Sequence, residues 1–404
     1  MIRYPLATTT WDDAEIQAIH DVIARDRYTM GEKVREFEAA FAAHFGVRYA
    51  VMVNSGSSAN LLMLAALSMH PDTLLPEGSE VIVPAVSWST TYYPVHQHGA
   101  RLRFVDVDPH TLNMDVAAVE AAIGPDTRAV LAVNLLGNPV QLDALRQLCD
   151  ERGLVLLEDN CESMGATLAG RQAGTFGLMG TFSCFFSHHI STMEGGLILT
   201  DDAVMADFLV SLRAHGWTRE LGADNHVFPK SGRAFDDLYR FVLPGYNVRP
   251  LEMSGAIGLH QLAKLPGLVS GRRANAVLFT EMFAHRSDLR VQRETGASSW
   301  FGFSFICQGD LAGRRDALVE WLMKAGIEVR PIVAGNFARN PVLSRLRHVE
   351  PGPLPGADEV HDQGFFVGNH HYPIAEPLEH LRQTIVQFRL HEGLSAEPAA
   401  GGAA

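Results

Sequence analysis

The stretch Leu154-Val155-Leu156-Leu157-Glu158-Asp159-Asn160 joins four apolar residues to two acids and an amide. Such an unbroken apolar run, bounded by polar residues, is typical of a strand buried on both faces of a parallel sheet. The carboxyl ends of these strands face the ligand crevice in open α/β sheets. We therefore expect Asp159 to lie at that crevice, either pairing with a protonated ring nitrogen or only capping a helix.

The alternation of strand and helix patterns continues on both sides of this stretch. Strand-like runs occur at residues 49–53, 80–84, 102–107 and 129–133, and again, around a turn, at 181–186 and 196–200. Helical spacing of apolar residues occurs between them and before them, at 12–25, 34–45 and 59–69. This βαβ order predicts an α/β fold with a mostly parallel, buried sheet.

The pattern changes near residue 266. An apolar helix is predicted at 253–265, and a strand at 300–308 with a helix at 315–325 then indicates a smaller α+β domain. The last twelve residues, GLSAEPAAGGAA, are small and polar, as in disordered tails. We predict an N-terminal segment packing with the small domain, a large domain, a small domain and a disordered tail, at residues 1–25, 26–265, 266–392 and 393–404.

Composition excludes several classes of protein. The 404 residues are 47% hydrophobic and carry a net charge of −13, which argues against a general nucleic-acid binder. No pair of the four cysteines forms CxC or CxxC, so neither a zinc site nor an iron–sulfur cluster is expected. No apolar run resembles a signal peptide or a membrane span. We expect a cytoplasmic protein with no metal and no membrane contact.

Two further segments suit a phosphorylated, planar ligand. Asn54-Ser55-Gly56-Ser57-Ser58-Ala59-Asn60 joins a strand to a helix, where backbone N–H groups and hydroxyls would bind phosphate, or where the serines only cap the helix. Trp88 follows the strand that ends at Pro84, so its indole would either stack on a planar ring or pack in the core.

Residues 183–196 read S-C-F-F-S-H-H-I-S-T-M-E-G-G. If the strand extends into this segment, the adjacent His188 and His189 point to opposite faces. Two histidines that cannot face one site argue against a metal pair.

Taken together, these segments resemble the DegT/DnrJ/EryC1/StrS family of sugar aminotransferases and dehydratases. The resemblance spans nearly the whole chain and rests on ordered motifs at residues 28–34, 37–38, 55–57, 104–108, 137–139, 158–162 and 245–249. It implies a fold type I, aspartate aminotransferase-like large domain with a mostly parallel sheet, a smaller α+β C-terminal domain and a vitamin B6 cofactor.

The resemblance also assigns roles to individual residues. Cofactor phosphate is expected at Gly56, Ser57 and Ser183. Trp88 would stack on the pyridine ring, Asp159 would pair with its nitrogen, and Glu162 would lie near its hydroxyl. Asn247 and Arg249 would be cofactor-binding residues lent by a neighbouring subunit, which implies a homodimer with shared active sites. Nucleotide-sugar contacts are expected from Tyr28, Thr29, Ser187, His215, Arg219, Glu328 and Arg330.

One departure from the family pattern decides the expected chemistry. Aminotransferases of this family carry, before the Glu-Gly-Gly turn, a lysine that bonds covalently to pyridoxal 5'-phosphate. Alignment on Ile190 and on Glu194-Gly195-Gly196 places His188 there, and no lysine occurs from residue 34 to 229. An imidazole, with an ordinary pKa of about 6.5, is a free base near pH 7 but cannot make that bond.

The substitution resembles the branch of 3-dehydratases that act on nucleotide-linked 4-keto-6-deoxy sugars. Without a C-x-C cysteine set, the chain resembles the type that needs no cluster, uses pyridoxamine 5'-phosphate regenerated from L-glutamate, and takes a GDP-linked sugar on the way to colitose of O-antigen. His188 would then be the catalytic base. The alternatives are an aminotransferase, a 3-dehydratase of another nucleotide sugar, and a catalytically inactive sensor.

Overall fold

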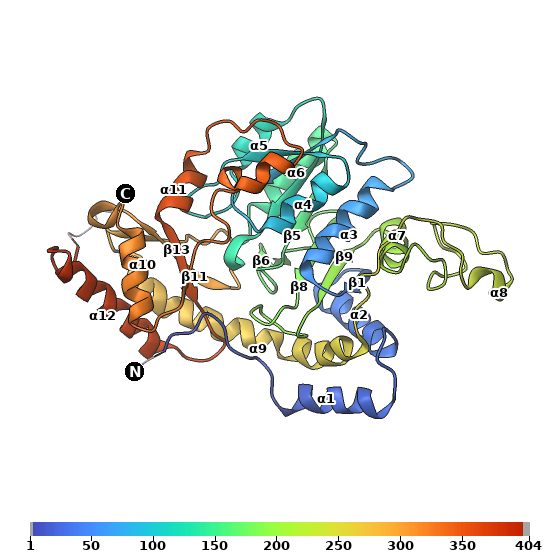
Figure 1. Ribbon diagram of the computed structural model, residues 1–404, viewed down its shortest axis with the longest axis horizontal. Helices are drawn as coiled ribbons and strands as arrows, with labels where there is room; N and C mark the ends of the chain where they lie inside the picture. Colours follow the sequence, from blue (N-terminus) through green and yellow to red (C-terminus); the bar gives the residue numbers. More distant parts are fainter. Residues whose placement is uncertain (1–2, 399–404) are drawn as a thin grey trace.

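The computed structural model of the chain describes residues 3–398, whose elements surround two main sheets (Figure 1). The larger sheet has seven strands in the order β1-β9-β8-β5-β4-β2-β3. Four neighbouring pairs are parallel, and only the pairs that β9 makes with β1 and β8 are antiparallel. The predicted α/β class is confirmed. The strands are β1 (Tyr49–Val53), β2 (Glu80–Pro84), β3 (Arg101–Val105), β4 (Thr127–Val133), β5 (Val155–Asp159), β8 (Met179–Ser183) and β9 (Gly196–Thr200).

Both faces of this sheet are covered by helices, which explains its continuous apolar strands. Successive side chains of β4 enter different cores: Leu131 packs on one face and Val130 on the other. The first face is covered by α3 (Gly56–Ser68), α4 (Ser89–Gln97) and α7 (Ala203–Arg213). The second face is covered by α2 (Glu32–Phe45), α5 (Val116–Ala122), α6 (Leu142–Arg152) and part of α9 (Glu252–Phe283).

The smaller sheet is antiparallel, in the order β10-β11-β13-β12, and has its own aromatic core. Phe279 of α9 stacks on Phe303 of β11 in that core, with ring centroids 4.1 Å apart. The elements of this part are β10 (Leu289–Val291), β11 (Gly302–Cys307), α10 (Arg315–Lys324), β12 (Val329–Arg330), α11 (Pro355–Gln363), β13 (Gly364–Gly368) and α12 (Ala375–His391).

Short elements complete the description. A hairpin of β6 (Thr167–Leu168) and β7 (Arg171–Gln172) follows β5, and α8 (Ala234–Asp237) lies on an arm that projects from the body (Figure 1). Four 3-10 turns span Leu135–Gly137, Gly309–Leu311, Phe337–Arg339 and Pro341–Arg345. Among the helices within residues 3–398, none combines the length and apolarity needed to cross a lipid bilayer.

Helix α9 is longer than the helix predicted at 253–265. It continues through Pro266, although an interior proline removes one backbone hydrogen bond and costs roughly 3 kcal/mol. Burial along its whole length offsets that cost, because Leu262 packs against the large sheet and Phe283 in the small core. The predicted boundary at 265/266 therefore falls inside one continuous helix, which both parts share.

The two ends of the chain differ from prediction. Tyr4 lies in the core of the small sheet, but α1 (Asp13–Ala24) packs on the first half of α9, with Val22 near Ala256. In the predicted disordered tail, Arg389 Nε donates to the Ser395 carbonyl (2.7 Å). Residues 393–398 are thus held by hydrogen bonds that composition alone does not reveal. Residues 1–2 and 399–404 lie outside the described residues.

Candidate active site

A cavity of about 650 Å³ opens where the carboxyl ends of the large sheet meet the smaller sheet. Its volume is within the range of about 300–1,000 Å³ common for small-molecule sites. The sequence-predicted residues that line it are Gly56, Ser57, Trp88, Asp159, Glu162, Ser183, Ser187, His188 and Arg330. The structure thus gathers segments more than 270 residues apart around one space.

One wall of the cavity is the start of helix α3. Ser55 caps the helix by accepting a hydrogen bond from the Ser58 N–H (3.1 Å), and the first turn carries Gly56 and Ser57. A Cβ on Gly56 would lie 2.7 Å from the Cβ of Ser183, so only glycine allows the two segments to meet. Free N–H groups, a helix dipole and hydroxyls at one point suit a phosphate group.

Asp159, at the end of β5, is nearly buried and tightly held. Its Oδ2 accepts hydrogen bonds from Asn60 Nδ2 (2.8 Å) and Thr91 Oγ1 (2.7 Å), and its Oδ1 accepts from the Cys161 N–H (3.2 Å). Asp159 therefore does not cap a helix but presents a fixed carboxylate at the cavity. Sequence reasoning missed Asn60 and Thr91, although each lies three or four residues along a helix from a predicted site residue, Gly56 or Trp88.

Trp88 and Glu162 complete the ring-sized space. The Trp88 side chain is 58% exposed although it lines the cavity, so an indole face is available for a planar ligand. Glu162 Oε2 accepts the Leu136 N–H (2.9 Å), and burial, with a smaller contribution from Asp159, raises the pKa of Glu162 to about 7. Near neutral pH this carboxyl is protonated in only a fraction of the molecules. It can therefore donate a hydrogen bond to a ligand hydroxyl or accept one from it.

His188 lies in the cavity wall, but not on a strand. Strand β8 ends at Ser183, and a turn closed by the His188 N–H to the Phe185 carbonyl (2.9 Å) presents the imidazole. The predicted strand at 181–186 was therefore too long, because Phe185 and Phe186 are exposed aromatics of a loop that imitate an apolar strand. Burial and the charge of Arg272 lower the pKa of His188 to about 4, so the imidazole is a neutral base near pH 7.

His189 faces away from the cavity. It is fully buried, and its Nε2 lies 3.1 Å from the Ser299 carbonyl. The two histidines therefore face different parts of the structure, as predicted. The segment that carries them is a turn and not a strand. Within residues 3–398, no three His, Cys, Asp or Glu side chains converge in the way that a metal site requires.

Seven predicted residues do not line this cavity. His215, Arg219 and Arg249 surround Trp217: the His215 ring centroid lies 4.7 Å from that of Trp217, and the two guanidinium carbons lie 5.9 and 5.7 Å from it. Asn247 joins this group by accepting a hydrogen bond from Arg249 Nε (3.0 Å). We call these five residues the Trp217 cluster, whose central tryptophan sequence reasoning missed.

The other three predicted residues outside the cavity are Tyr28, Thr29 and Glu328. Thr29 pairs with Leu251, and the Tyr28 carbonyl accepts the Glu252 N–H (3.0 Å). Glu328 accepts the Leu6 N–H (3.0 Å) and so ties the N-terminal segment to the small sheet. Its contact in this chain is structural.

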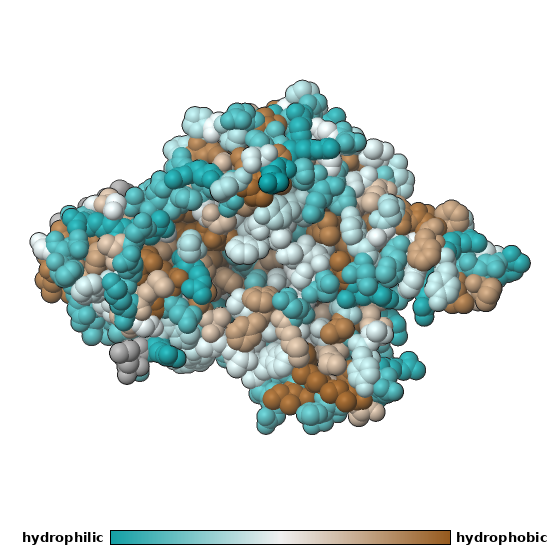
Figure 2. Space-filling view, in the orientation of Figure 1, coloured by the Kyte–Doolittle hydropathy of each residue, from teal (hydrophilic) through white to brown (hydrophobic). Residues whose placement is uncertain are grey.

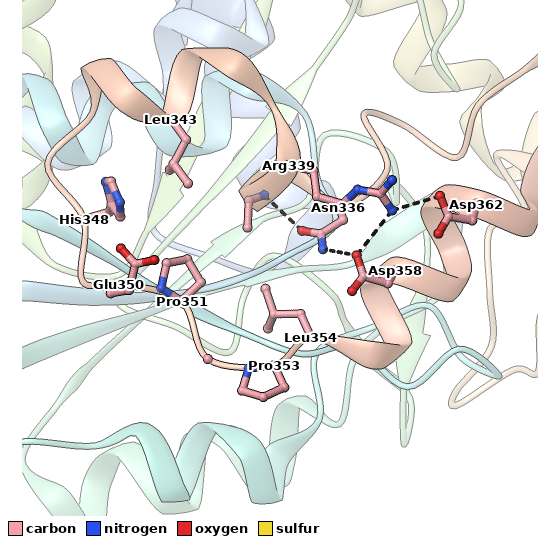
Figure 3. Close-up of a pocket in the computed structure, with 12 residues that line it drawn as sticks. Asn336, Arg339, Leu343, His348, Glu350, Pro351, Pro353, Leu354, Asp358 and Asp362 are labelled. Atoms are coloured by element: carbon pink, nitrogen blue, oxygen red, sulfur yellow. Dashed lines mark hydrogen bonds and ion pairs between the residues drawn. The ribbon is translucent and has the colours of Figure 1, made fainter.

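A second, more open cavity of about 520 Å³ lies beside α11 (Figure 3). Three of its charged groups form one network: Arg339 Nη1 lies 2.8 Å from Asp362 and 3.4 Å from Asp358, which also accepts from Asn336 Nδ2 (2.9 Å). None of the sequence-predicted residues lines it. The chemistry of the molecule therefore concentrates in the first cavity.

The residues of the first cavity fit a pyridine cofactor with a phosphate group. The α3 N-terminus can hold the phosphate, the exposed Trp88 face can stack on the ring, and the fixed Asp159 carboxylate can bind a ring N–H⁺. Among residues 3–398, the Nδ1 atom of His188 has no hydrogen-bond partner although it is shielded from solvent, so His188 presents a free imidazole to the cavity.

Fold and cavity together are those of a fold type I enzyme, and comparison with known proteins specifies the family. The model of the DegT/DnrJ/EryC1/StrS aminotransferase family matches residues 9–384, and the chain belongs to this family. Within it, the chain is 53% identical over 387 residues to GDP-4-keto-6-deoxy-D-mannose 3-dehydratase of Escherichia coli O55:H7, covering 95% of this chain and all of that protein.

Solved structures agree. A crystal structure of an H188N mutant of GDP-4-keto-6-deoxymannose-3-dehydratase with bound GDP-perosamine superposes with a TM-score of 0.93 at 52% identity, covering 95% of this chain and 100% of the other. A second structure of that enzyme, with a trapped PLP-glutamate geminal diamine, has a TM-score of 0.93 at 53% identity over the same shares of the two chains.

Proposed function

We propose that this protein is a sugar 3-dehydratase that removes the C3 hydroxyl of GDP-4-keto-6-deoxy-D-mannose. The observation that carries the proposal is the free, neutral imidazole of His188 in a cavity that otherwise suits a vitamin B6 cofactor. The similarity to 3-dehydratases over 95% of the chain supports the choice of reaction. The product would enter dideoxysugar synthesis, for colitose of O-antigen, and the proposed location is the cytoplasm.

The proposed cofactor site uses groups that converge in this chain. Gly56, Ser57 and Ser183 would hold the phosphate. Trp88 would stack on the ring, Asp159 would keep the ring nitrogen protonated, and Glu162 would face the ring hydroxyl. When bound, pyridoxamine 5'-phosphate would supply an amine that condenses with the C4 ketone and a ring that takes up electrons as the aminomethyl carbon loses its proton and returns them as the C3 hydroxyl leaves.

His188 acts as the base in this proposal. A neutral imidazole can accept the proton from the aminomethyl carbon of the cofactor, and in its protonated form it can assist departure of the hydroxyl. The Ser187 hydroxyl, which lines the same cavity, is a second donor for that departure. Because imidazole forms no covalent bond with the cofactor, the phosphate and ring contacts must retain it.

Each turnover would release the 3-deoxy-4-keto sugar and ammonia, and L-glutamate would restore the amine form with 2-oxoglutarate as product. Both substrates carry negative charge, and Arg330 projects into the cavity from β12. Its side chain makes a hydrogen bond only to the neighbouring Val329 carbonyl (3.0 Å) among those found in the described residues. Arg330 is thus available to an anionic substrate.

We also propose a homodimer with shared active sites. The arm around α8 is rich in exposed apolar side chains, which appear in brown at the right of Figure 2. Large exposed apolar patches commonly mark protein interfaces. The Trp217 cluster at the base of this arm lies outside its own chain's cavity, as expected for residues lent to a neighbour. Sedimentation equilibrium should give twice the mass of the chain, and an Arg249→Ala variant should lower the affinity for the cofactor although Arg249 lies outside its own chain's cavity.

The reaction is tested by incubating the protein with GDP-4-keto-6-deoxymannose, pyridoxal 5'-phosphate and L-glutamate. Mass spectrometry should show a sugar that has lost the C3 oxygen, and ammonia should accumulate with 2-oxoglutarate. An aminated sugar without free ammonia would identify an aminotransferase instead. Turnover only of a sugar linked to another nucleotide would keep the chemistry but change the substrate, and no turnover at all would favour a sensor.

A further inference from the structure

His188 lacks the polar partner that usually orients a catalytic histidine. Catalytic imidazoles are commonly held by a carboxylate or carbonyl on the second ring nitrogen. Here Nδ1 of His188 has no partner within residues 3–398. The imidazole is instead flanked edge-on by two aromatic rings, Phe185 at 6.0 Å and Phe301 at 5.1 Å between centroids. Its orientation therefore depends on where Phe301 is fixed.

The backbone around Phe301 is strained and firmly held. Trp300 has a φ of 49°, which is unusual for a bulky residue and persists only where the surroundings enforce it. The Phe301 N–H donates to the Leu136 carbonyl (3.0 Å), and a Cβ on Gly137 would lie 2.5 Å from the Trp300 nitrogen. This loop is therefore in tight contact with Leu136 and Gly137, and the Leu136 N–H also donates to Glu162.

This loop also contacts a buried cation. Arg272 of α9 is 5% exposed, and its Nη1 donates to the carbonyls of Phe301 (3.0 Å) and Asn369 (2.8 Å). No carboxylate pairs with it among the ion pairs of residues 3–398, and its Nε has no partner. A buried, unpaired charge is costly, and such groups concentrate at functional sites.

We propose that Arg272 is a positioning residue for His188: its guanidinium holds the backbone of Phe301, whose ring orients the imidazole, and it places a buried positive charge beside that residue. The inference rests on the proposed role of His188 as the base. Burial, followed by the charge of Arg272, lowers the pKa of His189, which is adjacent to His188. The other charged or titratable groups that line the cavity with His188 are Asp159, Cys161, Glu162, Glu194 and Arg330.

In the holoenzyme, two variants of Arg272 distinguish the effect of its charge from the effect of its hydrogen-bond geometry. Arg272→Gln keeps a donor but removes the charge, so the pKa of His188, followed by NMR with His188→Asn for assignment, should rise by about one unit. The acid limb of kcat/KM should move by the same amount. Arg272→Lys keeps the charge, so the pKa should stay while kcat falls about tenfold through lost orientation. Arg273→Gln is the matched control, because Arg273 also donates hydrogen bonds to backbone carbonyls. It should change neither the pKa of His188 nor kcat.

An unchanged pKa of His188 in Arg272→Gln, or full kcat in Arg272→Lys, would overturn the proposal. If Arg272→Gln does not fold, Phe301→Leu takes its place, because it keeps the carbonyl that Arg272 binds and removes only the ring. In Phe301→Leu the proposal requires a lower kcat. The pKa of His188 should stay low, because Arg272 keeps its charge. Full kcat in this variant would refute the proposal. If no dehydration occurs in the unaltered protein, the proposed function fails, but the NMR titration still measures the effect of Arg272.

Discussion

The imidazole of His188 lies edge-on to the ring of Phe301, with centroids 5.1 Å apart and planes inclined by 68°. A base that is oriented by an apolar ring keeps both nitrogens free of permanent partners. It can accept a proton on one side of the cavity and deliver it on another, because no fixed hydrogen bond has to break. This geometry suits an elimination in which proton removal and hydroxyl departure involve the same side chain.

Replacing His188 by Asn should abolish dehydration while leaving the cofactor bound. General-base catalysis contributes about 10²- to 10⁴-fold, so kcat should fall by at least about a hundredfold. Ammonia release measures the activity, and the absorbance of the bound cofactor measures its retention. His189→Asn is the adjacent control: it alters a buried histidine that faces away from the cavity, and correctly folded protein should keep most of its activity.

The stability of the cofactor-free protein should report the pKa of His188. Because this pKa is lowered from about 6.5 to about 4, the unfolded chain binds more protons between those pH values. The free energy of unfolding therefore falls as pH drops through this window. His188→Asn removes the effect, so its Tm relative to the unaltered protein should rise on acidification, by an amount on the order of 1–2 °C. A constant difference in Tm from pH 7 to 4.5 would contradict the buried, neutral state.

Glu162 should give the opposite slope. Burial raises its pKa to about 7, so the folded protein binds more protons between about 4.5 and 7, and this contribution to stability is lost as pH rises. Glu162→Gln keeps an oxygen for the Leu136 N–H but cannot ionise. Its Tm relative to the unaltered protein should therefore increase from pH 5 to pH 8, as followed by thermal unfolding without cofactor. The same increase for Glu194→Gln would show that the effect is not specific to Glu162.

The contacts that hold Asp159 should matter for cofactor affinity. Thr91→Val removes one hydrogen bond to a buried carboxylate, a contact worth about 1.5–3 kcal/mol, and should weaken cofactor binding at least about tenfold. Titration of the cofactor-free protein by absorbance measures the Kd. Thr200→Val removes a buried hydroxyl of β9 that donates to the Leu178 carbonyl. This hydroxyl does not line the cavity, so the Kd should be unchanged.

Gly56→Ala should damage the phosphate wall through a direct clash. The added Cβ would lie 2.7 Å from the Cβ of Ser183, so α3 and β8 must separate. The Kd for the cofactor should rise by about tenfold or more, and inorganic phosphate should compete less well. Combining Gly56→Ala with Ser183→Gly removes the closest contact and leaves Cys161 Sγ at 3.0 Å, so the stability of the double variant should exceed that of Gly56→Ala alone. No such recovery would mean that the close approach is not the cause.

Much of the site was predictable because its residues lie at the ends of apolar strands and starts of helices. Gly56, Trp88, Asp159 and Ser183 all meet in the cavity for this reason. The end of β8 was not predictable, since exposed aromatics in a loop have the same pattern as a buried strand. The clamp of Asn60 and Thr91 on Asp159 depends on how two helices dock on the sheet, which no local pattern encodes.

The limits of the large-scale prediction have a similar cause. Pro266 signals a helix end locally, but packing on two cores outweighs that signal. The tail at 393–398 has the composition of a disordered segment, yet Arg389 and Arg286, both buried, bind its backbone and its Glu397. In each case contacts between distant residues decide the outcome.

The unbroken course of α9 has a consequence for how this protein can vary. The helix carries Leu262 in one core and Phe279 in the other, so the number of residues between them sets the angular phase of the two sheets. Inserting a single residue there would turn everything beyond it by about 100° and advance it by about 1.5 Å. Arg330 would then swing out of the cavity, and Arg272 would leave Phe301. We therefore expect this stretch to tolerate exchange of side chains but not a change in its length.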